Sequence, residues 1–381
     1  MNTENIEKIK YIHIMSHISI VYNAQIVYMI NENNKEFKEE EHLFIISNQK
    51  VYEPIKHYKN VMFLDDISVD IKQLKKYANM SKYIFLHSNT LSEKVLYRLD
   101  DNILNKIIWC EWGHDLYDKR EEPKTIYRKI RRVIGDIIRL NYIKKKQIQK
   151  FYAIGIGFQY DAIEVRRRFG NNMKIVMTPY GYIKDNKKNI DNIINNTVEE
   201  KEYKKIMVGH SAYDFLNHKK LFSQLAKYKD ENIKISLVLA YGCDDYAEEV
   251  KKEAIKLFGN DKVEIIDKMM SQEEYLKYLS TVDICLLDYK HQAALGNIYF
   301  LLYMGKKLFL NKDGIIKLFA NLENIETYNI EDIDKMDYAE FSRKIENPLY
   351  GKQFAEFHIN DENYIKIWEN TLEELNNNLN G

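Results

Sequence analysis

Short apolar runs alternate with amphipathic stretches along the first half of the chain. The apolar runs are rich in Ile, Val, Phe and Tyr, which predicts buried strands. Between them, residues 21–30 and 71–77 carry apolar side chains at the spacing of one helix face. Strands that alternate with helices predict a parallel sheet covered on both faces. The predicted strands are residues 11–15, 43–47, 61–65, 83–87, 106–110, 151–155 and 174–178.

The same alternation starts again after a polar, Asn- and Lys-rich stretch at residues 186–203, which we interpret as a linker. The pattern therefore predicts an α/β protein with two doubly wound, Rossmann-like domains, at residues 1–185 and 204–360. In such sheets, ligands bind beyond the carboxyl ends of the strands. The predicted strands of the second domain are residues 205–209, 235–240, 262–266, 283–287 and 307–311, with helices near 217–229, 245–257, 272–280 and 295–304.

Composition supports an ordinary globular protein of 381 residues, with 45% apolar and 30% charged residues. No apolar run approaches the roughly 20 residues that a membrane-spanning helix needs. The first residues lack the basic and apolar segments of a secretory signal, so we expect a cytoplasmic protein. Its three cysteines, Cys110, Cys243 and Cys285, are widely spaced and odd in number, which favours reduced thiols over disulfides or a zinc site.

Charge is balanced over the whole chain but not along it. Residues 124–150 hold ten Lys or Arg and one acid, Asp136. Isoleucines in this stretch share one helix face, and Arg128, Lys129, Arg131 and Arg132 lie around it. A basic amphipathic helix is typical of a protein that lies on an anionic membrane. Nucleic acid is a weaker candidate because no aromatics are interleaved with the basic residues, and a surface helix packed on its own domain is the alternative.

Small polar turns follow two strands of the second domain. Gly209, His210 and Ser211 come after the first strand, and Tyr241 and Gly242 after the next. Glycine lets backbone N–H groups approach an anion, and a helix N-terminus favours negative charge. We expect a nucleotide-phosphate site here, with ordinary capped turns as the structural alternative.

A third strand end has the sequence "YKHQAALGNI". It places Lys290 and Gln292 after the strand, and Gly296 and Asn297 at the start of an apolar helix. Lys290 can meet a phosphate as a point charge, and Gly296 allows close backbone approach. No Asp-x-Asp motif for a divalent ion follows a strand, so we expect a metal-independent site that uses basic side chains and helix N-termini.

One stretch of the first domain, "IIWCEWGHDLYDKR", has an unusual density of tryptophan and titratable residues at and after the end of a predicted strand. Asp115 is the preferred candidate for proton transfer, with Glu111 and His114 as alternatives. Trp112 can stack on a sugar. His87, at the end of another strand, is expected on the same rim.

Four stretches, "WCEWGHDLYD", "MVGHSAYDFLNHK", "LAYGCDDYAEEV" and "YKHQAALGNIYFLLYMGKKLFLN", resemble those of bacterial TDP-N-acetylfucosamine:lipid II N-acetylfucosaminyltransferases, the 4-alpha-L-fucosyltransferases of glycosyltransferase family 56. The resemblance covers roughly residues 10–370. It implies a GT-B architecture, with an acceptor domain and a nucleotide-sugar domain facing a cleft. It also implies a last helix, within residues 361–381, that crosses back.

The resemblance implies site residues as well. Trp112, Gly113, Asp115 and Tyr117 match the acceptor-side motif, and Gly209 and Ser211 the first donor turn. Tyr241 and Gly242 match the second turn, and Gln292 and Gly296 the last motif. The implied donor is a TDP-linked 4-acetamido-4,6-dideoxygalactose. The implied acceptor is an undecaprenyl-diphosphate-linked sugar at the cytoplasmic face of the membrane, which would account for the basic helix.

The sequence therefore predicts a metal-independent glycosyltransferase that works peripherally on the inner face of the cytoplasmic membrane, in surface polysaccharide assembly. Two alternatives remain at this point. One is a sugar-nucleotide epimerase or phosphorylase with the same pocket, and the other is a non-catalytic sugar-nucleotide binding protein.

Overall fold

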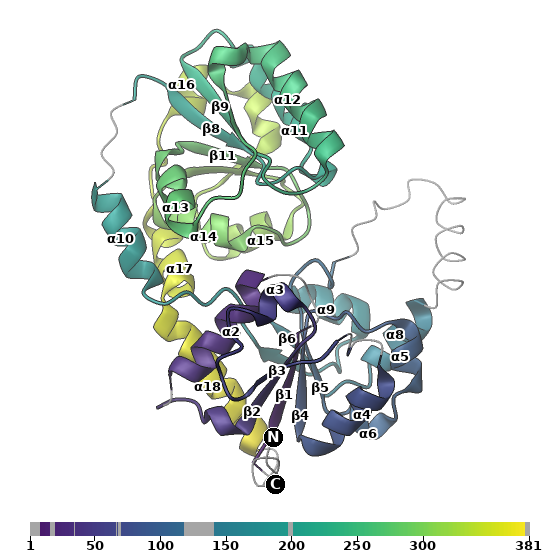
Figure 1. Cartoon of the computed structure of the whole chain (residues 1–381). Coiled ribbons are helices and arrows are strands. Elements are labelled where there is room, and N and C mark those ends of the chain that lie inside the picture. The colour runs from purple at the N-terminus through teal and green to yellow at the C-terminus, as the bar shows by residue number, and fades with distance from the viewer. Residues whose placement is uncertain are drawn as a thin grey trace. The chain divides into compact units, whose positions relative to one another are not determined.

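A computed structural model describes residues 8–15, 20–33, 35–65, 67, 70–117, 141–196 and 201–377. The chain forms two compact units. The first unit consists of Met1–Ile183 together with Glu362–Gly381, and the second of Lys184–Asp361. Each unit is built on one parallel β-sheet with helices on its faces (Figure 1).

The sheet of the first unit has the strand order β3-β2-β1-β4-β5-β6-β7 among the described residues, with all pairs parallel. The strand order reverses between β1 and β4, so the sheet is doubly wound. The strands are β1 (Tyr11–Met15), β2 (His42–Ile46), β3 (Val61–Phe63), β4 (Tyr83–His87), β5 (Ile107–Cys110), β6 (Ala153–Ile156) and β7 (Ile175–Met177).

Helices cover both faces of this sheet because side chains alternate along each buried strand. Ile12 packs into one core with α4, α5, α6, α8 and α9, whereas Tyr11 packs into the other with α2, α3 and α18. The helices are α2 (Ile20–Glu32), α3 (Gln49–Tyr52), α4 (Ile71–Met80), α5 (Glu93–Arg98), α6 (Asp101–Leu104), α8 (Asn141–Ile148), α9 (Asp161–Phe169) and α18 (Asp361–Asn377).

The C-terminal helix α18 completes the first unit. Trp368 is 1% exposed, and its indole N–H donates to the carbonyl oxygen of Pro179 at 2.9 Å. Thr371 donates to the carbonyl of Met177 at 2.7 Å. In Figure 1 this yellow helix lies against the purple N-terminal elements. The last segment of the chain therefore packs on the first, as the resemblance implied.

The sheet of the second unit has the order β10-β9-β8-β11-β12-β13 among the described residues, again all parallel. Its strand order reverses between β8 and β11. The strands are β8 (Lys204–Val208), β9 (Ile233–Val238), β10 (Val263–Ile266), β11 (Ile284–Leu287), β12 (Lys307–Leu310) and β13 (Tyr328–Asn329). The helices are α10 (Asn186–Asn196), α11 (His218–Leu225), α12 (Asp244–Phe258), α13 (Gln272–Thr281), α14 (Leu295–Tyr303), α15 (Ile315–Leu322), α16 (Tyr338–Ser342) and α17 (Leu349–Ile359).

Most of the stretch interpreted as a linker is helix α10, which packs on α13 in the second unit. Ile190 and Ile193 give it a buried face that the polar composition hides. Asn186 donates to the carbonyl of Ile359 at 3.2 Å. The linker assignment is therefore wrong for residues 186–196, and residues 197–200 lie outside the described part of the chain.

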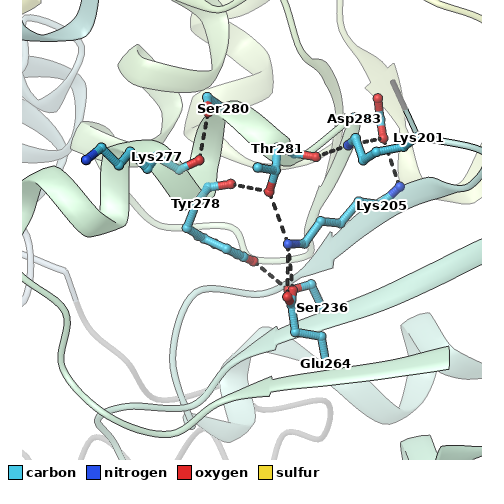
Figure 2. A network of polar contacts seen from close by, with 9 residues as sticks. All are labelled: Lys201, Lys205, Ser236, Glu264, Lys277, Tyr278, Ser280, Thr281 and Asp283. Carbon is cyan, nitrogen blue, oxygen red and sulfur yellow. Dashed lines mark hydrogen bonds and ion pairs between the residues drawn. The ribbon is translucent and has the colours of Figure 1, made fainter. Parts of the chain in front are cut away.

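A polar network closes the amino-terminal edge of the second sheet (Figure 2). The ammonium of Lys205 is nearly buried and lies 2.8 Å from Glu264 Oε2 and 3.0 Å from Thr281 Oγ1. Ser236 donates to the same Glu264 oxygen at 2.6 Å. Asp283 accepts from the backbone N–H of Lys205 at 2.9 Å. Every charge here has a partner, so the network holds strands β8, β9 and β10 together rather than awaiting a ligand.

The predicted strands and helices are confirmed in order, with small differences at their ends, and so is the doubly wound α/β class. Strand β13 and several helices were not predicted, among them α9, α15 and the 11-residue α17. Within the described residues, no helix is both long and apolar enough to cross a bilayer.

Candidate functional site

The carboxyl edge of the second sheet gathers the loops that follow β8, β9, β11 and β12. At the reversal of strand order, the N–H of Gly209 donates to the carbonyl of Leu286 at 3.0 Å. The side chain of Asn217 donates to the carbonyl of Asp288 at 2.9 Å. The first and fourth strands of the unit thus present their following loops side by side, which is where doubly wound sheets bind ligands.

Gly209 forms a turn that no other residue could form without displacing its surroundings. Its φ is +70°, in the left-handed region. A Cβ on Gly209 would lie 2.4 Å from Nε2 of His218, the first residue of α11. The backbone is therefore brought directly against a histidine ring at the start of a helix.

Three buried polar atoms surround this turn without a hydrogen-bond partner among the described residues. They are Nδ1 of His210, Oγ of Ser211 and Nε2 of His218. Burial lowers the pKa of His210 to about 3 and that of His218 to about 4, so both rings are neutral at pH 7. Buried polar groups are nearly always paired, so unpaired ones gathered at one turn indicate a place where a polar ligand binds.

The second turn is joined to the first. Ala212 donates its N–H to the carbonyl of Tyr241 at 2.8 Å, and Cys243 donates to the carbonyl of Ala212 at 2.9 Å. A Cβ on Gly242 would lie 2.5 Å from the oxygen of Ala212, so this approach also requires glycine. Tyr213 and Tyr241 stand above it, 41% and 47% exposed, with ring centroids 6.3 Å apart. The joined turns carry an exposed aromatic pair that a flat ring could stack on.

The loop after β11 contributes a paired set of charges. The buried carboxylate of Asp288 lies 2.8 Å from the ammonium of Lys220 and accepts from Asn311 at 2.6 Å. Lys290 is exposed and lies 3.3 Å from Asp313. These lysines already have anionic partners, so a phosphate at this edge would rely first on backbone N–H groups and neutral side chains.

Helix N-termini converge on the same edge. Helices α11, α12, α14 and α15 each follow a strand of the second sheet, and no side chain caps any of them. Helix α13, by contrast, has a full capping box from Ser271 and Glu274. Gln292 is buried just before α14, and Gly296 lies in its first turn with little around its Cα. Open N–H groups at a helix start attract anions, which fits the expected donor role of Gly296 and Asn297.

In the first unit, Asp115 is the centre of a hydrogen-bond cluster. One oxygen accepts from the indole of Trp109 at 2.6 Å and from the N–H of Asn89 at 2.7 Å. The other accepts from the N–H of Trp112 at 2.8 Å. Through these three donors, the side chain of Asp115 ties the loops after β4 and β5 together. Its role as a proton acceptor remains a prediction that this geometry does not favour.

The other two candidates differ sharply in exposure. Glu111 is fully buried and accepts from the N–H of Gly113 at 2.6 Å. His114 is exposed, and its Nε2 lies 3.2 Å from Oγ of Ser88, which has a left-handed φ of 60°. Of the three, His114 is the most exposed, while Asp115 is partly exposed.

The remaining acceptor-side residues occupy several environments. Trp112 is nearly buried, with its ring centroid 5.9 Å from that of Tyr180. Gly113 has a φ of 74°, and Tyr117 donates to Asp161 at 2.5 Å. His87 points into the core, where its Nε2 lies 2.9 Å from Nδ1 of His13, so it does not reach the rim as expected.

The predicted membrane-binding residues Arg128, Lys129, Arg131 and Arg132 lie outside the described residues. Among the residues that are described, no group of three or more His, Cys, Asp and Glu side chains is arranged to hold a metal ion.

A family comparison covers the second unit. Residues 192–377 match the model of the family described as 4-alpha-L-fucosyltransferase glycosyl transferase group 56. The match spans most of the second unit and helix α18 of the first. The chain is a glycosyltransferase, and the matched range contains all the predicted donor-side residues, from Gly209 to Asn297.

Solved structures show the same fold for the whole glycosyltransferase. A glycosyltransferase from Rickettsia africae has a TM-score of 0.66 at 13% identity, covering 96% of this chain and 98% of the other. HepE from Anabaena in complex with UDP has a TM-score of 0.63 at 10% identity, covering 96% and 100%. An alpha,alpha-trehalose-phosphate synthase (UDP-forming) from Burkholderia vietnamiensis has a TM-score of 0.60 at 10% identity, covering 97% and 100%. These similarities confirm the GT-B fold class.

Sequence analysis did not single out four residues at the carboxyl edges of the two sheets. His218 and Asp288 lie beside the donor turns, Tyr213 stands with Tyr241, and Asp161 meets Glu111. A signal existed for Asp288, which directly follows a predicted strand. Tyr213 and His218 lie in the same sequence stretch as Gly209, whereas Asp161 reaches Glu111 only through a tertiary contact.

Proposed function

We propose that this glycosyltransferase moves a deoxyamino sugar, similar to 4-acetamido-4,6-dideoxygalactose, from a TDP-linked donor to an undecaprenyl-diphosphate-linked saccharide. The family match supports a fucose-like sugar. The resemblance of the acceptor-side and donor-side motifs to lipid II N-acetylfucosaminyltransferases supports the donor nucleotide and the lipid-linked acceptor.

The single observation that carries the donor half is the convergence at Gly209. Unpaired buried atoms of His210, Ser211 and His218 surround a backbone turn that only glycine can form, beside several uncapped helix starts. In this proposal, backbone N–H groups and the hydroxyl of Ser211 hold the diphosphate. Tyr213 and Tyr241 flank the base. The developing charge on the leaving diphosphate is stabilised by these fixed dipoles, without a divalent ion.

His114 is the residue we propose as the general base that takes the proton of the acceptor hydroxyl. Its imidazole is exposed, and Ser88 orients it through a 3.2 Å contact. Asp115 and Glu111 hold the loop that carries His114. This replaces the expectation that Asp115 itself takes the proton. Transfer would take place on the inner face of the cytoplasmic membrane, with the basic stretch at 124–150 facing anionic lipid.

The test is a donor panel. Purified protein is incubated with TDP-, UDP- and GDP-linked sugars and a membrane extract that contains undecaprenyl-diphosphate-linked saccharides, with EDTA present throughout. We expect label to enter the lipid fraction, with release of TDP, only from a TDP-linked 4-acetamido-4,6-dideoxy sugar. Transfer that requires added manganese would overturn metal independence.

Three other outcomes separate the alternatives. Turnover of the donor without extract would favour an epimerase or phosphorylase. Nucleotide binding with no turnover in any mixture would favour a non-catalytic binding protein. Flotation with phosphatidylglycerol liposomes tests the membrane surface, and binding that is unchanged by Arg131→Glu with Arg132→Glu would contradict it.

A further inference from the structure

Two carboxyl groups meet at the carboxyl edge of the first sheet, and no basic side chain of the described residues pairs with either of them. Glu111 directly follows β5, and Asp161 is the first residue of α9, which follows the neighbouring strand β6. Both side chains are fully buried. Neither forms an ion pair with a Lys, Arg or His of the described residues, so nothing there compensates two negative charges.

Their hydrogen bonds leave one oxygen unexplained. Glu111 accepts from the N–H of Gly113 at 2.6 Å and from the N–H of Gly157 at 3.5 Å. Asp161 Oδ1 accepts from the phenol of Tyr117 at 2.5 Å. Asp161 Oδ2 has no donor among the described residues, and the carboxyl group of Glu111 lies within hydrogen-bonding reach of the Asp161 side chain. Two carboxylates are both acceptors, so this contact forms only when one of them carries a proton.

Neighbouring acids raise these pKa values further. Asp115, on the same loop, acts on both groups, and Glu164, on the next turn of α9, acts on Asp161, whereas the hydrogen bond from Tyr117 lowers the pKa of Asp161. The thiol of Cys110, at the end of β5, is a further buried neighbour of Glu111. Arg167, further along α9, binds Glu164 through two 2.6 Å contacts. Burial is the largest cause of a raised pKa in both groups. The pKa of Asp161 rises to about 7, and that of Glu111 lies well above its ordinary value.

We propose that Glu111 and Asp161 share one proton at neutral pH, and that this proton fixes the segment 111–117. In this state the O–H of one carboxyl group donates to the carboxylate of the other. The segment is then held at both ends, through Gly113 by Glu111 and through Tyr117 by Asp161. Both are positioning residues, since neither reaches solvent.

Loss of the proton to water leaves two anions side by side in a medium that solvates them poorly. The contact breaks, and the segment carrying Trp112 and His114 loses its anchor. We therefore expect transfer to fall at alkaline pH through misplacement of the acceptor. This consequence for activity rests on the proposed function, whereas the shared proton does not.

Infrared difference spectroscopy of the purified full-length chain, in H₂O and D₂O, tests the proton directly. A protonated carboxyl group gives a carbonyl stretch separate from that of carboxylates. At pH 7 we expect this band in the wild type and its loss in Asp161→Asn and Glu111→Gln, which keep the shape of each side chain. Glu164→Gln is the matched control, on the same helix but bound to Arg167, and should keep the band.

Absence of the band in the wild type would overturn the proposal, as would its survival in both variants. If either variant fails to fold, titration of the wild-type band alone still decides, because the proposal requires it to disappear as the pH is raised above 7. A chain that shows the titrating band but transfers no sugar keeps the proton pair and refutes the proposed function. A chain that transfers sugar but shows no band supports the proposed function and refutes the shared proton.

Discussion

The imidazole of His218 occupies the space into which a side chain at Gly209 would project, with Nε2 2.4 Å from the position of that Cβ. The ring is held from its other side, where Nδ1 lies 3.2 Å from the hydroxyl of Tyr246. The ring therefore cannot move away from Gly209 without breaking its contact with Tyr246. The turn after β8, the start of α11 and the position of His218 are consequently one structural unit.

Gly209→Ala should disrupt this unit. The left-handed backbone costs about 1 kcal/mol with a Cβ, and the clash with His218 adds to it. We expect a donor affinity at least about tenfold weaker, because the N–H groups of the turn are displaced. Gly170→Ala is the matched control, since Gly170 also has a positive φ, 98°, but nothing lies within 4 Å of its Cβ position. Calorimetric titration with the nucleotide measures the affinity of each variant. Equal affinity for the two variants would show that the turn does not contact the donor.

Replacing His114 by Ala should lower the rate of transfer by about 10² to 10⁴, the usual contribution of a general base. The donor KM should stay nearly constant, because His114 belongs to the other unit. Single-turnover assays distinguish a change in the rate of transfer from a change in donor binding. Ser88→Ala, which removes only the orienting contact, should cause a smaller loss of rate. A wild-type rate of transfer in His114→Ala would show that His114 is not the general base.

Asp115→Asn should damage the fold rather than the chemistry. The carboxylate now faces two donors on one oxygen, from Trp109 and Asn89, and one on the other, from Trp112. The amide of Asn places N–H groups against at least one of these donors. We expect the free energy of unfolding to fall by about 2–4 kcal/mol, since a charged acceptor with buried donors is lost. Urea titration measures this. Unchanged stability with abolished transfer would restore Asp115 as a catalytic group.

The protein should lose stability as the pH falls below about 6.5. Burial lowers the pKa of His42, His87 and His210 to about 3, and that of His218 and His358 to about 4. It lowers the pKa of His13 still further from its ordinary value. The unfolded chain therefore binds more protons than the folded one in this range, so acidification favours unfolding. The loss begins near the unfolded pKa and continues through the folded ones.

Asp161 and Glu111 act in the opposite direction, because their raised pKa values make the folded chain bind more protons than the unfolded one. Their stabilising contribution to the free energy of unfolding is present at low pH and is lost as the pH rises through about 7. Six histidines outweigh two carboxyl groups, so the net change on acidification remains destabilising. Urea unfolding at pH 7 and pH 4.5 should show it, and His358→Gln should reduce the difference. A constant free energy of unfolding would contradict the burial of these rings.

The sequence predicted the two sheets well because a strand buried on both faces is almost continuously apolar. Its prediction failed where local composition and tertiary burial disagree. Helix α10 has a polar sequence whose two buried isoleucines are meaningful only once α13 is in place. Similarly, His87 is a polar residue at a strand end, yet it packs inward against His13 and the ring of Trp368.

The donor side was more predictable than the acceptor side for a physical reason. Gly209 directly follows β8 and Gly242 lies in the loop after β9, both with positive φ, so their places in the sequence could indicate them. The distinction between Asp115 and His114 depends instead on which side chain is saturated with donors and which is exposed. Those donors come from Trp109 and Asn89 on two different strand ends, so no local pattern could have revealed them.

The first unit is assembled from both ends of the polypeptide, and this affects how the protein is made. While the ribosome is still translating, the nascent face that carries Tyr11 and Phe85 has no Trp368 to cover it. The second unit is continuous in sequence and can fold as soon as it emerges. Synthesis of α18, rather than synthesis of the first 183 residues, is thus the step at which the first unit gains its full core.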